Sequence, residues 1–85
     1  MLANDTLVPL TDLARGETAV IREFRNQDLM LKLLEMGVLP GETVTLELRA
    51  PLGDPLSIRV SGYLLSIRKS EARSILVQKL SARSA

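Results

Sequence analysis

The hydrophobic residues between Asn26 and Gly37 recur at helical spacing. They fall three and four positions apart and form one wide apolar stripe, which consists of Leu29, Met30, Leu33, Leu34 and Met36. Asn26 is a favourable N-cap residue, and Gly37 can adopt the positive φ that commonly ends a helix. Because Pro40 follows three residues later, the pattern predicts one α-helix over about residues 26–36.

After Pro40 the hydrophobic period changes from 3.6 to 2. Apolar and polar residues alternate in two runs, whose apolar positions are Val44, Leu46 and Leu48 in the first and Leu56, Ile58 and Val60 in the second. Such alternation predicts antiparallel strands with one buried face and one solvated face. Less regular strands are predicted over residues 17–24, 63–68 and 75–80, with a short helical turn near 69–73. Pro9 restricts any strand near residues 7–10 to a short one at a sheet edge.

These elements predict a mainly β fold. About five short antiparallel strands, each with one solvated face, are expected to close on themselves to hide their edges. The economical solution is a small SH3-like barrel, with the helix covering one open end. We expect one domain over residues 7–80, between a flexible N-terminus at 1–6 and a flexible tail at 81–85.

Composition narrows the chemistry, because the 85 residues include no histidine and no cysteine. Zinc fingers, iron–sulfur ligation and Ser-His or Cys-His catalysis are therefore excluded, so we expect neither an enzyme nor an intrinsic cofactor. Any divalent metal contact would use hard carboxylate oxygens and would be weak or adventitious. The surface candidates for such contact are Glu42, Glu47, Asp54 and Glu71. The simpler interpretation is that all four are solvated carboxylates.

The distribution of charged residues suggests what the protein binds, and the lengths of its apolar stretches suggest where it is located. The net charge is +1, but residues 1–56 carry five basic and nine acidic side chains, whereas residues 57–85 carry six basic side chains and one acidic. Either the two halves of the chain interleave in space, so that basic and acidic side chains are mixed on the surface, or a basic face meets an acidic partner, phosphates or a membrane surface.

No apolar stretch is long enough to cross a bilayer and no secretory signal is visible, so a cytoplasmic location without direct membrane insertion is expected. Phe24 and Tyr63 are too few aromatics for a polyproline groove or for stacking nucleic-acid bases.

Three stretches of the chain resemble a known family. They are Leu33-Leu34-Glu35-Met36-Gly37-Val38-Leu39-Pro40-Gly41, Ala50-Pro51-Leu52-Gly53-Asp54-Pro55 and Leu64-Leu65-Ser66-Ile67-Arg68-Lys69-Ser70-Glu71-Ala72. The first two together resemble the ferrous iron transport protein A family, FeoA, and the third is similar to a further signature of that family. The resemblance spans residues 7 to 80. Within these stretches we interpret five turn-forming residues as a structural signature, namely Gly37, Pro40, Gly41, Pro51 and Pro55.

The resemblance implies a cytoplasmic SH3-like domain that supports bacterial Fe²⁺ uptake. Its partner would be FeoB, a large inner-membrane permease with a cytoplasmic GTP-binding domain, so the domain would be recruited to the inner face of that membrane. The residues that we consider for partner binding are Leu52, Gly53, Asp54, Arg59 and Arg68. Leu52 stands at the tip of a loop bracketed by two prolines, where it either docks onto a partner or folds down over the end of the barrel.

Three hypotheses follow. The first is a non-catalytic accessory domain that binds and modulates the cytoplasmic part of a ferrous iron permease. The second is a divalent transition-metal sensor or carrier, which the absence of imidazole and thiolate disfavours. The third is a self-associating structural module that forms a weak homodimer through its strand edges or the Leu52 loop.

Overall fold

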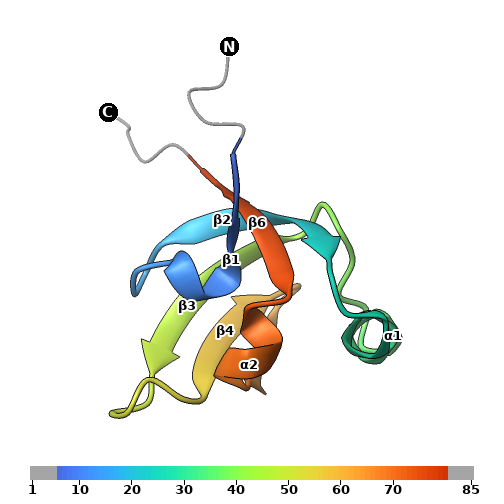
Figure 1. Ribbon diagram of the computed structural model, residues 1–85. Coiled ribbons are helices and arrows are strands. Elements are labelled where there is room, and N and C mark those ends of the chain that lie inside the picture. Colours follow the sequence, from blue (N-terminus) through green and yellow to red (C-terminus); the bar gives the residue numbers. More distant parts are fainter. Residues whose placement is uncertain (1–5, 81–85) are drawn as a thin grey trace.

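A computed structural model describes residues 6–80 and shows one curved antiparallel sheet with helices beside it (Figure 1). In chain order its elements are β1 (Leu7–Pro9), a 3₁₀ turn η1 (Leu10–Asp12), β2 (Thr18–Phe24), α1 (Gln27–Glu35), β3 (Thr43–Arg49), β4 (Leu56–Val60), β5 (Tyr63–Ile67), α2 (Lys69–Ala72) and β6 (Ile75–Lys79). The mainly β fold, the single longer helix and the short helical turn are confirmed. Apart from Thr6, the predicted flexible ends lie outside the described residues.

The sheet has six strands rather than about five, in the order β1-β6-β2-β3-β4-β5. Every neighbouring pair is antiparallel. The additional strand is β1, which is three residues long and stands at an edge, as Pro9 requires. The sequence pattern predicted closure, whereas the hydrogen-bonded order of the described residues leaves the sheet open between β1 and β5.

Helix α1 forms where the sequence predicted it. The Asn26 side chain accepts a hydrogen bond of 3.0 Å from the backbone N–H of Leu29, which caps the first turn. At the other end Gly37 has φ +84°, and the backbone N–H of Val38 bonds back to the carbonyl of Leu33 at 2.9 Å. This is the Schellman arrangement, and it returns Val38 to the hydrophobic core directly after the helix.

The hydrophobic core lies between the inner face of the curved sheet, η1 and α1. Its fully buried side chains come from almost every element, and the largest are Leu10, Leu13, Ile21, Leu46, Leu56, Ile58 and Ile75. From α1 only Leu29 and Leu33 are buried. Met36, which the sequence pattern placed in the same stripe, is 40% exposed beyond the end of the helix.

One predicted alternation is interrupted. The register between β3 and β4 shifts between Leu46 and Leu48, so Glu47 is an additional residue in β3. Such a β-bulge reverses which side of the strand the following residues occupy. Leu46 is therefore fully buried, whereas Leu48 is 49% exposed, and the prediction that both leucines share one buried face is wrong.

Candidate functional site

Residues 50–55 form a closed loop between β3 and β4. The Ala50 N–H donates to the Pro55 carbonyl at 3.0 Å, and the Gly53 N–H donates to the Ala50 carbonyl at 2.7 Å. Gly53 has φ +86°, which this turn requires. At the crown of the loop Leu52 is 94% exposed. The alternative in which Leu52 folds down over the end of the sheet is therefore wrong.

The Asp54 side chain joins this loop to α2. Its Oδ1 accepts a hydrogen bond of 2.9 Å from the backbone N–H of Lys69, the first residue of the helix. A carboxylate at this position satisfies a donor that the first turn of a helix leaves unpaired. Asp54 therefore holds the loop in place, and its neighbour Leu52 is presented on an anchored loop.

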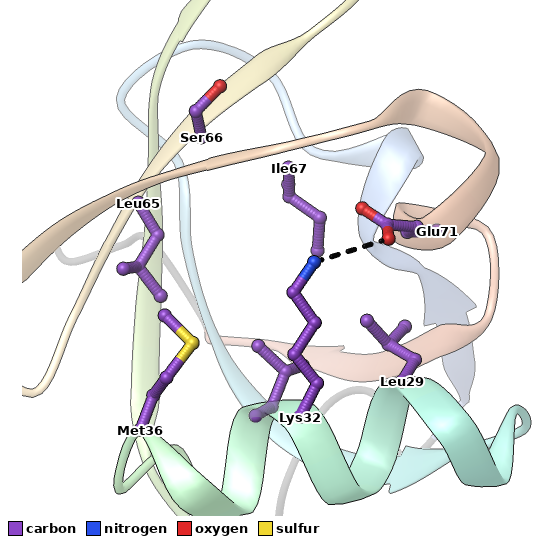
Figure 2. Close-up of a pocket in the computed structure, with 8 residues that line it drawn as sticks. Leu29, Lys32, Met36, Leu65, Ser66, Ile67 and Glu71 are labelled. Atoms are coloured by element: carbon purple, nitrogen blue, oxygen red, sulfur yellow. Dashed lines mark ion pairs between the residues drawn. The ribbon is translucent and has the colours of Figure 1, made fainter.

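Glu71 makes the equivalent connection between α2 and α1. Its Oε1 accepts a hydrogen bond of 3.1 Å from the Arg68 N–H, and its Oε2 lies 3.6 Å from the Lys32 Nζ. Figure 2 shows this ion pair reaching from α1 toward the α2 turn. The pair is largely solvent-exposed on the lysine side, so its contribution is mainly to orientation.

A cleft lies between α1, β5 and α2. Its polar part has a volume of about 470 Å³ and is lined by Lys32, Asp54, Pro55, Ser66, Arg68 and Glu71. A narrower apolar part adjoins it and is lined by Leu29, Lys32, Leu33, Met36, Leu65, Ser66, Ile67 and Glu71. In Figure 2 the Leu65 and Met36 side chains point toward each other across this apolar part. Among the described residues the Arg68 guanidinium has no hydrogen bond or ion pair, although it lines the polar part.

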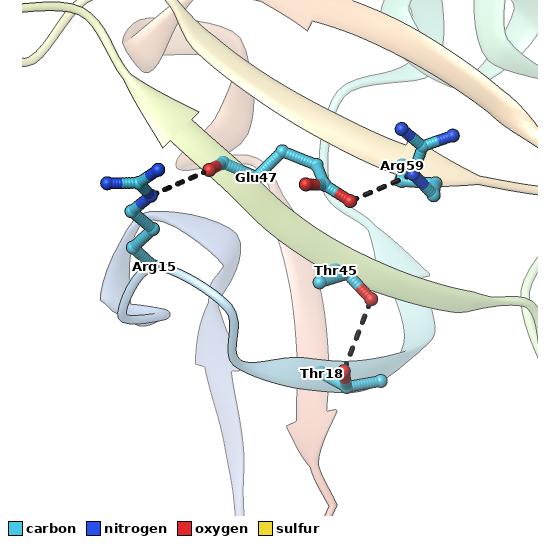
Figure 3. A network of polar contacts seen from close by, with 5 residues as sticks. All are labelled: Arg15, Thr18, Thr45, Glu47 and Arg59. Carbon is cyan, nitrogen blue, oxygen red and sulfur yellow. Dashed lines mark hydrogen bonds and ion pairs between the residues drawn. The ribbon is translucent and has the colours of Figure 1, made fainter.

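The structure brings together four of the five residues considered for partner binding. Leu52, Gly53 and Asp54 share the anchored loop, and Arg68 lies beside the helix turn to which Asp54 is bonded. Arg59 is different, because it is exposed on β4 between the buried residues Ile58 and Val60, and its Nε donates to the Glu47 Oε2 at 2.8 Å. Figure 3 shows this pair in a polar network with Arg15, Thr18 and Thr45.

The carboxylates considered for metal contact do not converge. Asp54 and Glu71 both line the cleft, but each already accepts a backbone hydrogen bond. Glu42 accepts from the Ser61 hydroxyl at 2.8 Å, and Glu47 is paired with Arg59. Within residues 6–80 no three carboxylates group closely enough to hold an ion.

The turn-forming signature residues have clear backbone roles. Gly37 ends α1, and the Gly41 N–H donates to the Ile21 carbonyl at 2.7 Å, which sets the start of β3 against β2. Pro51 and Pro55 both lie within the closed loop.

Lys32, Ser66 and Met36 were not predicted as site residues, because the cleft exists only once α1 packs beside β5. In the part of the chain that the structure covers, no helix has the length and apolarity needed to span a bilayer.

The open antiparallel sheet, with α1 and α2 beside it and the anchored loop at residues 50–55, defines a small SH3-like β domain. An NMR structure of an FeoA-like protein from Clostridium acetobutylicum has a TM-score of 0.82 and 31% identity, and the alignment covers 93% of each chain. Crystalline Stenotrophomonas maltophilia FeoA, complexed with zinc and described as a prokaryotic SH3 domain protein, has a TM-score of 0.72 and 27% identity over 88% of this chain and 99% of that one.

The family follows from the sequence comparison. Residues 8–79 match the family model described as the FeoA domain. The chain is also 36% identical over 74 residues to an Fe(2+) transport protein A/Fe(2+) transporter FeoB fusion protein from Porphyromonas gingivalis. That alignment covers 86% of this chain but only 9% of the relative, so the chain spans less than a tenth of that protein's length. The chain belongs to the FeoA family, and the predicted resemblance is confirmed.

Proposed function

We propose that this FeoA domain is a non-catalytic accessory domain of ferrous iron uptake, and that it binds and modulates the cytoplasmic part of a FeoB-type permease. The observation that carries the proposal is the Porphyromonas gingivalis relative, which is named for both an Fe(2+) transport protein A part and a FeoB transporter part in one polypeptide. Covalent fusion keeps two domains at a high effective concentration, an arrangement suited to partners that also associate when separate. The domain would then act on the cytoplasmic face of the membrane.

The surface best suited to this docking is the loop of residues 50–55 with the adjacent cleft. Leu52 offers an exposed apolar side chain on a loop closed by two backbone hydrogen bonds and anchored through Asp54. A pre-ordered loop loses less conformational entropy on binding than a mobile one. Arg68 adds a cation beside that loop that is not paired with any other residue that the structure describes, and it can pair with an acidic group on the permease.

The proposal assigns no resident metal to this chain. Zinc accompanies the Stenotrophomonas maltophilia relative. Among the described residues no three carboxylates group together, and each candidate already has a protein partner. Borderline metals such as Fe²⁺ and Zn²⁺ favour imidazole or thiolate ligands, which the sequence lacks. Divalent cations would therefore make only weak surface contacts.

Titration calorimetry with the purified cytoplasmic portion of a FeoB-type permease tests the proposed function. We expect saturable binding with a Kd in the micromolar range, and the titration is done with and without guanine nucleotide because the partner's state can change its surface. Failure to associate at tens of micromolar under both conditions would contradict the proposal. Measuring GTP turnover of the same permease portion, with and without this domain, shows whether the binding also modulates the partner.

A further inference from the structure

Strand β5 is one of the two edge strands of the sheet. It pairs with β4 on one side, and no other hydrogen bond to β5 occurs among the described residues. The opposite edge, β1, is protected because it has only three residues and includes Pro9. The sequence of β5 is Tyr-Leu-Leu-Ser-Ile, with no charge, no proline and no bulge in its pairing.

The β4–β5 hairpin determines which backbone groups point outward. Its two-residue turn, Ser61-Gly62, has φ values of +53° and +80°, as in a type I′ turn. In such a hairpin the flanking pair, Val60 and Tyr63, exchanges both backbone hydrogen bonds, and every second pair does so thereafter. The N–H and C=O groups of Leu64 and Ser66 therefore point away from β4.

Apolar side chains accompany this free edge. Tyr63 and Leu64 are each 58% exposed, although native edge strands usually carry charges that discourage further pairing. The cleft described above runs beside β5, with Leu65 and Met36 in its apolar part. At the end of the strand lies Arg68, whose guanidinium has no hydrogen bond or ion pair within residues 6–80. An edge strand, an apolar groove and a cation thus lie next to one another.

We propose that β5 accepts an extended segment of the permease's cytoplasmic part as an additional strand. The segment's backbone bonds to Leu64 and Ser66, apolar side chains at alternate positions pack toward Leu65 and Met36, and an acidic residue pairs with Arg68. Main-chain hydrogen bonds supply the affinity in this mode of recognition, and the alternate side chains supply specificity. The inference rests on the proposed function, because it names the part of this domain that the same partner engages.

Amide hydrogen exchange, measured by NMR on the free domain and on its complex with the cytoplasmic portion of the permease, tests this inference. We expect the Leu64 and Ser66 amides to exchange at least about tenfold more slowly in the complex, because they gain hydrogen-bond acceptors. The Leu65 amide is an internal control, since it already bonds to β4. A complex that leaves Leu64 and Ser66 unprotected overturns the inference and leaves the proposed function standing. Absence of any complex overturns both.

A backbone variant gives a second test. Ser66→Pro removes an N–H that points to solvent, a position where sheets tolerate proline. We expect this variant to bind the permease portion at least about tenfold more weakly, because one hydrogen bond is lost and its acceptor on the permease segment is left unpaired. Ser66→Ala keeps the N–H and is expected to bind like the original chain. A folded Ser66→Pro variant with undiminished affinity contradicts the inference, and the exchange rates of the unsubstituted chain decide independently of this variant's folding.

Discussion

The Asp54 carboxylate accepts a 2.9 Å hydrogen bond from the backbone N–H of Lys69, fifteen residues further along the chain. This contact joins the loop between β3 and β4 to the first turn of α2. It also assigns Asp54 a structural role, because its Oδ1 holds the loop against the first turn of the helix. Presentation of Leu52 therefore depends on a carboxylate two residues away.

Replacing Asp54 by alanine is expected to lower the free energy of unfolding by about 1 kcal/mol, since one hydrogen bond to a charged acceptor is lost near the surface. Urea denaturation measures this change. Asp12→Ala is the matched control, because the Asp12 carboxylate makes no hydrogen bond or ion pair with the described residues. Equal stability of the two variants would show that the Asp54 contact does not anchor the loop.

Gly37→Ala is expected to lower the free energy of unfolding by about 1–2 kcal/mol, because an alanine must adopt left-handed backbone angles there. Gly37 has φ +84°, and an added Cβ would meet no atom within 4 Å, so the penalty comes from the backbone alone. Gly37→Asn should be milder, because asparagine tolerates this conformation better than alanine. An unchanged urea midpoint for Gly37→Ala would contradict the Schellman ending of α1.

The bulge in β3 places Leu46 and Leu48 in different environments, although the sequence pattern predicts that they share one buried face. Leu46→Ala is expected to destabilise the domain by about 2–5 kcal/mol, because it leaves a cavity in the core. Leu48→Ala should change stability by less than about 1 kcal/mol, since half of that side chain is already solvated. Comparable losses for both variants in thermal unfolding would show that Leu48 is also a core residue.

Divalent metal is expected to bind weakly. Anaerobic calorimetry with Fe²⁺ at micromolar concentration should give no saturable one-to-one heat. Among the described residues no three carboxylates group together, and Asp54, Glu71, Glu42 and Glu47 each have a protein partner. A stoichiometric signal that disappears on Asp54→Asn or Glu71→Gln substitution would favour the sensor or carrier hypothesis. Glu35→Gln, on the exposed side of α1, is the matched control.

Local signals in the sequence were sufficient for α1 and for β4. Asn26 and Gly37 each act within four residues, so the helix could be read from spacing alone. The strand β4 also follows its pattern, because its alternation is uninterrupted and all three apolar positions are buried.

Features that depend on distant neighbours could not be predicted. The bulge at Glu47 arises from pairing with β4, and nothing in the residue types between Leu46 and Leu48 marks it. The cleft requires α1 to lie beside β5, although the starting residues of these two elements, Gln27 and Tyr63, are 36 positions apart in the chain. For the same reason Arg59 was grouped with Arg68, although its side chain is paired with Glu47.

The most direct test of docking through the anchored loop compares two exposed leucines. Leu52→Gln and Leu31→Gln each replace an exposed apolar side chain, but Leu31 belongs to α1 and not to the 50–55 loop. In calorimetry with the permease's cytoplasmic portion, we expect Leu52→Gln to raise the Kd at least about tenfold, the loss typical of a central interface residue. Leu31→Gln should leave the Kd unchanged. Equal affinities for both variants and the unsubstituted domain would contradict the assignment of this loop as the docking surface.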